Sequence, residues 1–119
     1  MTGKITVGTI QDTDGNTVAS TYVTNGSAKH WIHLVGTGTI TTLDSFNSSS
    51  ISDLGTGRYQ TNFSNNTNNV NYAVAAADQY QTSGFYSSTT SSHNIFINTS
   101  DPRSAVDSIV ATMLQGDLA

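Results

Sequence analysis

The amino-acid sequence predicts a single all-β domain with antiparallel strands over residues 1–119. Thr, Ser and Asn together make up 46 of the 119 residues, the charged fraction is only 10%, and Glu is absent. Thr favours strands whereas Glu favours helices, so this composition shifts the expectation towards β structure. Apolar and aromatic residues also recur at the two-residue spacing of strands, which argues against a disordered chain.

The first 26 residues are expected to form an N-terminal hairpin, and residues 27–119 the core. Lys4–Ile10 alternates polar and apolar residues and predicts a half-buried strand, and Thr17–Val23 predicts the returning strand. Between them, Asp12–Asn16 contains an Asp-Gly pair typical of tight turns. This segment also resembles the start of a calcium loop, but the acidic residue that closes such a loop is absent. The hairpin is expected to act as an attachment or subunit-exchange arm.

The central stretch Ser27–Phe63 contains the only Trp and the strongest predicted strand, His30–Val35. In a strand, Trp31, His33 and Val35 share one face and His30, Ile32 and Leu34 share the other. Both faces are partly apolar, which suits a strand covered on both sides by another sheet or by neighbouring subunits. The two His residues lie on opposite faces, so they cannot chelate one metal ion together.

Two Gly-x-Gly pairs, at residues 36–38 and 55–57, are predicted to be turns. The second joins Ser50–Leu54 to Arg58–Phe63, a hairpin in which Tyr59, Thr61 and Phe63 face inward. Neither pair extends to the longer glycine motif of dinucleotide sites. The sequence therefore favours structural turns over a phosphate-binding loop.

The second half of the chain predicts further strands separated by polar loops. Tyr72–Gln79 and Asn94–Asn98 are expected to be strands, and for residues 104–115 a strand is favoured over a helix. The alanines Ala75–Ala77 indicate close approach of backbones, as occurs near a symmetry axis. With the two-sided strand at His30–Val35, they predict a homotrimer.

Tyr80–Ser92 combines aromatic residues with Ser, Thr and Gly, a composition shared with adaptable binding loops. Its aromatic residues can equally anchor another strand, and the sequence leaves both interpretations open. The candidate residues for contact with a receptor or partner are Tyr80, Phe85, Tyr86 and His93.

Composition and motifs exclude several classes of function. The net charge is −4 and the four basic residues are scattered, which argues against nucleic-acid binding. No apolar run is long enough to span a membrane, and no export signal is evident. No nucleophile motif or paired-carboxylate pattern identifies an enzyme. We therefore expect no catalytic, metal-binding or cofactor-binding residues and no cofactor.

Five motifs then follow one another in an order that resembles a family of phage tail-fibre and related virion proteins. The motifs are Asn25–Trp31, Asp44–Asp53, Gly55-Thr56-Gly57, Asn62-Phe63 and Asn71–Val74, and the match covers Lys4 to Val74. The closing segment Gly116–Ala119 is also similar. The chain departs from the family pattern at His30, where Ala is usual, and at Ser48, where Val is usual. Family members often carry this unit at the end of a longer chain, whereas here we expect it to be nearly the whole protein, without a fibre shaft.

The resemblance implies a virion surface protein with a β-sandwich fold of jelly-roll type, assembled as a homotrimer. It implies a tail-fibre or receptor-binding tip module that contacts other virion proteins and a host surface glycan or protein. A capsid decoration (cement) protein is the alternative, and a small surface-glycan hydrolase is a second one. The residues expected to pack in the core or between subunits are Trp31, His33, Val35, Phe46, Tyr59, Phe63 and Tyr72.

Overall fold

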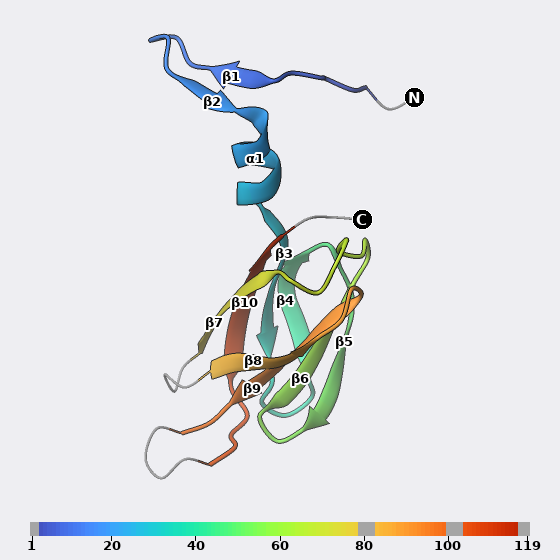
Figure 1. Ribbon diagram of the computed structural model, residues 1–119. Coiled ribbons are helices and arrows are strands. Elements are labelled where there is room, and N and C mark those ends of the chain that lie inside the picture. Colours follow the sequence, from blue (N-terminus) through green and yellow to red (C-terminus); the bar gives the residue numbers. More distant parts are fainter. Residues whose placement is uncertain (1–2, 79–82, 100–103, 117–119) are drawn as a thin grey trace.

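The protein consists of an all-β body and an N-terminal arm (Figure 1). The computed structural model describes residues 3–78, 83–99 and 104–116, without the side chains of Phe85 and Tyr86. The body holds two four-stranded antiparallel sheets, ordered β4-β3-β10-β7 and β5-β6-β9-β8. The first comprises β3 (Ala28–Val35), β4 (Thr41–Phe46), β7 (Ala73–Asp78) and β10 (Ile109–Gln115). The second comprises β5 (Ser48–Gly55), β6 (Arg58–Phe63), β8 (Ser83–Ser88) and β9 (Ser92–Ile97).

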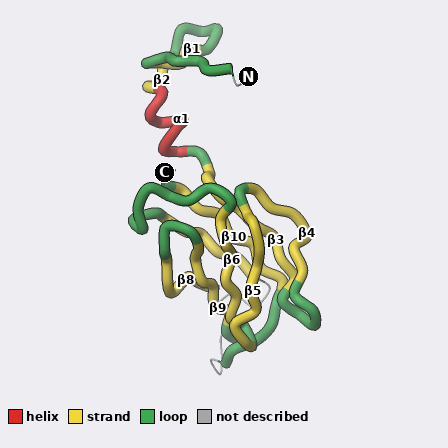
Figure 2. The backbone as a smooth tube through the Cα atoms, turned by 90° about the vertical axis from the view of Figure 1, so that its right-hand side faces the viewer, coloured by secondary structure: helices red, strands yellow, loops and turns green. Residues whose placement is uncertain are grey.

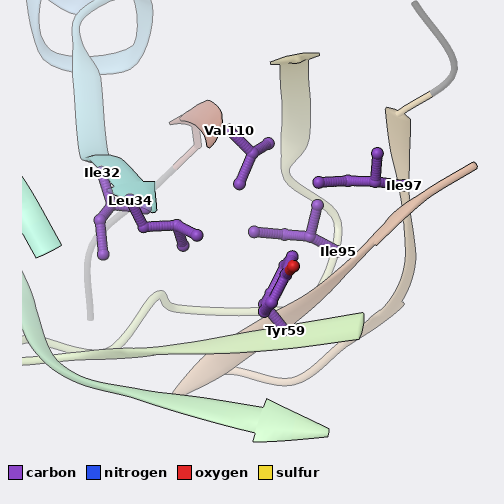
Figure 3. Close-up of a cluster of buried hydrophobic side chains, with 6 residues drawn as sticks. All are labelled: Ile32, Leu34, Tyr59, Ile95, Ile97 and Val110. Atoms are coloured by element: carbon purple, nitrogen blue, oxygen red, sulfur yellow. The ribbon is translucent and has the colours of Figure 1, made fainter. Parts of the chain in front are cut away.

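The hydrophobic core lies where side chains from both sheets meet (Figure 3). The larger of two buried clusters takes three residues from each sheet: Ile32, Leu34 and Val110, and Tyr59, Ile95 and Ile97. A second cluster contains Phe63, Tyr72 and Leu114. Because both sheets contribute to the larger cluster, neither can bury its inner face without the other.

Both glycine pairs are turns, as predicted, and one residue of each has a further steric role. Gly36 donates its N–H to the Ser108 carbonyl at 2.8 Å, and a Cβ at this position would collide with the Tyr59 hydroxyl and the Ser108 carbonyl oxygen. Gly57 has a φ of 64°, and its N–H bonds to the Asp107 carboxylate at 2.8 Å. The same Asp107 oxygen accepts a bond from the Tyr59 hydroxyl at 3.0 Å. The two turns therefore close around one buried Tyr side chain.

Several predicted strands are confirmed. The β5–β6 hairpin places Tyr59, Thr61 and Phe63 inside. Residues 73–78 and 109–115 form strands, and β9 buries Ile95 and Ile97. Where two interpretations were open for Tyr80–Ser92, residues 83–88 form strand β8.

The N-terminal prediction is partly wrong. Residues 9–19 form a short hairpin of β1 (Thr9–Gln11) and β2 (Thr17–Ala19), turning at Gly15 with a φ of 87°. Lys4–Gly8 is not a strand, and Ile5 is 89% exposed instead of half-buried. Residues 20–26 form helix α1 (Ser20–Gly26), where a second extended segment was expected to continue. An extended segment this long needs a partner strand, and the partner β1 ends after three residues.

The arm stands away from the body in both views (Figures 1 and 2). The molecule measures 52 × 32 × 25 Å, and its radius of gyration is 16.9 Å, against about 13.5 Å for a compact domain of this length. Among the described residues 3–26, none is buried. A hydrogen bond joins the body to the end of the arm: the side-chain amide of Gln115 donates to the Gly26 carbonyl at 2.9 Å.

Candidate functional site: an apolar sheet face and the N-terminal arm

The outer face of the β4-β3-β10-β7 sheet carries apolar side chains that no part of the described chain covers. Alternation along β3 and β10 sends every second residue to the core and the others outward. In register, Phe46, Trp31, Met113 and Ala75 form one row across the four strands. The three large members of this row are 52%, 36% and 44% exposed. These values are high for large apolar groups that stand side by side.

Two further rows extend this surface. Asp44, His33, Ala111 and Ala77 are aligned in the second row, and Thr41, Val35 and Ile109 in the third. Ile109 is 37% exposed. We call the eleven residues of the three rows the outer apolar face. Within them the titratable side chains are one His and one Asp, which are cross-strand neighbours.

The outer apolar face is uneven. Trp31 and Met113 border a hollow of about 370 Å³, whose lining also includes Ala75, Ala77 and Ala111. Ala77 of β7 and Ala111 of β10 are opposite each other, so two short side chains meet there, whereas Ala75 is opposite Met113. The surface therefore has a ridge of large side chains beside a trough of small ones.

The described side chains on the outer face of the second sheet are mainly polar, with Phe96 among them. The Gln60 amide donates to Asn62 at 2.7 Å, and the Asn62 amide donates to the Ser50 hydroxyl at 3.0 Å. The Arg58 guanidinium lies over the Phe96 ring, 5.9 Å from its centroid. Amide and hydroxyl groups bonded in this way suit contact with water. The two outer faces of the body thus differ in chemistry.

Two buried histidines link the sheets inside the body. His30 on β3 and His93 on β9 are 1% and 0% exposed, and their ring centroids are 5.2 Å apart. Their Nε2 atoms bond to the hydroxyls of Thr61 at 3.0 Å and Thr112 at 3.3 Å. Burial lowers the pKa of His30 to about 4; burial and then the neighbouring His30 lower the pKa of His93 to about 3. Both rings are therefore neutral at physiological pH.

This pair corrects one sequence-based prediction. His93 was expected to contact a receptor or partner, but it is buried and its ring packs against His30 and Phe63. The sequence reasoning left His93 between the Tyr80–Ser92 segment and the strand expected at Asn94–Asn98, whereas it is the second residue of β9 and points to the core. It is a structural residue.

The other predicted site residues fall into three groups. Tyr59, Phe63 and Tyr72 are buried in the core. Trp31, His33, Val35 and Phe46 do not pack in the core but belong to the outer apolar face, so packing between subunits is the role left open for them. Tyr80 lies outside the described residues, and Phe85 and Tyr86 lie in β8 with side chains outside the description.

The sequence identified both sides of β3 as apolar but did not select the inner one. The inner face consists of His30, Ile32 and Leu34. The imidazole of His30 can be buried because the Thr61 hydroxyl forms a hydrogen bond with it and the His93 ring packs against it, and both belong to the other sheet. Trp31 is left outside, where it meets Phe46 and Met113. The contribution of Met113 and Ile109 to the outer apolar face was missed, although their alternation with Val110 and Leu114 is visible in the sequence.

The arm is the second candidate feature. Helix α1 has no buried residue, and Tyr22 and Val23 are 73% and 46% exposed. A seven-residue helix and a hairpin with three-residue strands are each marginal in water on their own. At the base of the arm a groove of about 780 Å³ is lined by residues of both parts, among them Val23, Lys29 and Phe46.

Neither a metal site nor a membrane span is found in the part of the chain that the structure describes. No group of three or more His, Cys, Asp or Glu side chains in residues 3–78, 83–99 and 104–116 is placed to hold a metal ion. The described helix is too short to cross a membrane.

Comparisons with known proteins give no relative for this chain: no family model, no curated protein and no solved structure matches it.

Proposed function

We propose that this chain is a non-enzymatic structural module of a phage virion surface, of the tail-fibre or receptor-binding tip type, which assembles as a homotrimer. The observation that carries the proposal is the outer apolar face. Its large apolar side chains Phe46, Trp31 and Met113 are exposed in one row, and contiguous exposed apolar patches of this kind mark interaction surfaces. The motif order from Asn25 to Val74, which resembles that of tail-fibre proteins, supports the virion assignment.

The finer description of the fold belongs to this proposal. We take the two sheets as the layers of a β-sandwich, because Ile32 and Val110 of one sheet share a buried cluster with Ile95 of the other. The pairs β3–β4, β5–β6 and β8–β9 are hairpins of consecutive strands. In each pair both strands belong to the same sheet: β3–β4 to the first sheet, and β5–β6 and β8–β9 to the second. Three such hairpins favour a sandwich built from hairpins over the jelly-roll connection expected from the resemblance.

A capsid decoration protein is the second candidate, and the arm favours it. Residues 3–26 project from the body with no buried side chain, and Ile5, Tyr22 and Val23 are available to an underlying protein. An attachment element of this kind suits a protein clamped onto a shell of other subunits.

Localisation on the particle separates the two candidates. Gold-labelled antibodies against the chain would be applied to purified virus particles from the same source and imaged by electron microscopy. The tip assignment predicts label at the ends of tail fibres, and the decoration assignment predicts label over the head. Particles that carry no label, with the chain detected in the same lysate, would overturn both.

Binding to a host glycan is tested separately on a glycan array. Retention of an intact glycan supports receptor contact, whereas release of shortened glycans from the array would overturn the non-enzymatic assignment.

A further inference from the structure

We propose that the outer apolar face of the β4-β3-β10-β7 sheet is the surface through which copies of this chain bind one another, with the ridge of Trp31 and Met113 entering the alanine trough of the next copy. This inference rests on the proposed assembly and names its interface. Its occupant is a second copy of the same chain.

Self-complementary shape is the first reason for choosing a second copy. The ridge of Trp31 and Met113 and the trough lined by Ala75, Ala77 and Ala111 lie side by side in one face. A ridge beside a trough lets one copy fill the hollow of its neighbour while presenting its own hollow to the next. Contacts between two different patches of one surface generate a closed ring, such as a trimer, where the rotation between copies closes, and an open filament where it does not.

Charge is the second reason. Three rows of the face contain one His and one Asp, and His33 and Asp44 are direct cross-strand neighbours. Identical faces of strong charge would repel each other, whereas the Asp44 side chain is the one carboxylate in these three rows. A partner recognised through complementary charge would require a charged face, which this sheet does not present in the three rows.

Area is the third reason. The seven residues of β10 span about 24 Å at roughly 3.4 Å per residue, and four strands spaced by about 4.8 Å span about 19 Å. Two such flat faces bury about 900 Å² together, and the relief of Trp31 and Phe46 adds to that. The flat-face area of about 900 Å² is close to the value of about 1,000 Å² that separates specific interfaces from incidental contacts.

The opposite outer face provides the internal comparison. There the Gln60 amide bonds to Asn62 and the Asn62 amide bonds to the Ser50 hydroxyl, and the Arg58 guanidinium lies over the Phe96 ring. The described chain therefore has one sheet face suited to burial and one suited to solvent. An interface on the first leaves the second exposed on the outside of the assembly.

Two substitutions on the face and one matched control test the inference. Met113→Lys places a charge on the ridge, and Ala75→Lys fills the trough. Leu54→Lys is the control, because Leu54 is an apolar residue of similar exposure, 47% against 44% for Met113, in strand β5 of the other sheet. Circular dichroism and thermal unfolding verify that each variant is folded, and light scattering after size exclusion gives the mass.

We expect the wild type and Leu54→Lys to have the same multiple of the 12.6 kDa protomer mass at micromolar concentration. Both face variants should dissociate, with a dissociation constant raised on the order of 100-fold, because an unpaired ammonium would be buried. Face variants that keep the wild-type mass would overturn the inference, as would a wild type that is monomeric or a control that dissociates equally.

The result is independent of the particle labelling. A wild-type dimer that the face variants dissociate would uphold this interface and refute the homotrimer. A self-associating chain that is absent from virus particles would uphold the interface and refute the virion assignment.

Discussion

The buried His30–His93 pair should make the protein lose stability as the pH falls. Both folded-state pKa values, about 4 and about 3, lie below the ordinary value of 6.5 that applies when the chain unfolds. Below pH 6.5 the unfolded chain therefore binds more protons than the folded one, so the free energy of unfolding decreases as pH decreases. The loss begins near pH 6.5 and is complete near pH 4 for His30 and pH 3 for His93.

The size of the effect follows from the shifts. At about pH 5, protonation favours the unfolded state by roughly 2 kcal/mol for each ring, since one pH unit corresponds to about 1.4 kcal/mol. The two rings together give a loss of roughly 4 kcal/mol relative to neutral pH. That is a large part of the stability of a typical small domain, which is about 5–15 kcal/mol.

Urea unfolding, followed by circular dichroism at about pH 7.5 and about pH 5, measures this loss. His93→Gln retains a side chain that can bond to the Thr112 hydroxyl but cannot titrate, and it should remove about half of the pH-dependent loss. His33→Gln is the matched control, because His33 is exposed on the outer apolar face. A wild-type loss below about 1 kcal/mol, or an equal effect of the two substitutions, would refute the burial of a neutral pair.

Three other predictions concern the body and the arm. Gly36→Ala should lower the free energy of unfolding by about 1–3 kcal/mol, because its Cβ would collide with the Tyr59 hydroxyl and the Ser108 carbonyl, whereas Gly8→Ala, in open space, should change little in the same urea titration. Ile95→Ala should cost about 2–5 kcal/mol because Ile95 is fully buried, while Leu43→Ala, at a site 57% exposed, should stay within about 0.5 kcal/mol; equal costs would contradict the assignment of the core. Deletion of residues 1–26 should leave the melting temperature of the body nearly unchanged, because no described arm residue is buried; a clear fall in scanning calorimetry would show that the arm supports the body.

The sequence was most informative where one face of a strand is apolar and the other polar. Strand β6 alternates Tyr59, Thr61 and Phe63 with Arg58, Gln60 and Asn62, and its inward face followed directly. For β10 the pattern was less clear: its β-branched content and the number of strands elsewhere favoured a strand, and the structure then shows Val110 and Leu114 buried while Ile109 and Met113 are not. In strands such as β6 the alternation of apolar and polar side chains predicts which residues are buried.

It was least informative where both faces are apolar or where a short element lacks tertiary support. For β3, either His30 or Trp31 could face inward, and the decision came from Thr61 and His93 on another sheet. Helix α1 was missed because β-branched residues such as Thr21, Val23 and Thr24 favour strands. A strand prediction there required a pairing partner, and β1 is too short to supply one.

The candidate site was foreseen in part for the same reason. The expectation that His30–Val35 is covered on both sides identified Trp31, His33, Val35 and Phe46 as packing residues, and all four lie in the outer apolar face. That face also needs Met113 and Ile109 of β10, and the pairing of β10 with β3 connects segments about 80 residues apart. Such long-range pairing cannot be read from local periodicity.

The most direct test of the proposed assembly is the fluorescence of Trp31, because this is the only Trp in the chain and it stands on the ridge. In an isolated protomer Trp31 is 36% exposed, and association through the outer apolar face would cover it. The proposal predicts blue-shifted emission at high protein concentration and a red shift on dilution, at the same concentration at which the mass falls to that of one protomer. Emission that is independent of concentration, while light scattering still shows association, would contradict an interface on this face.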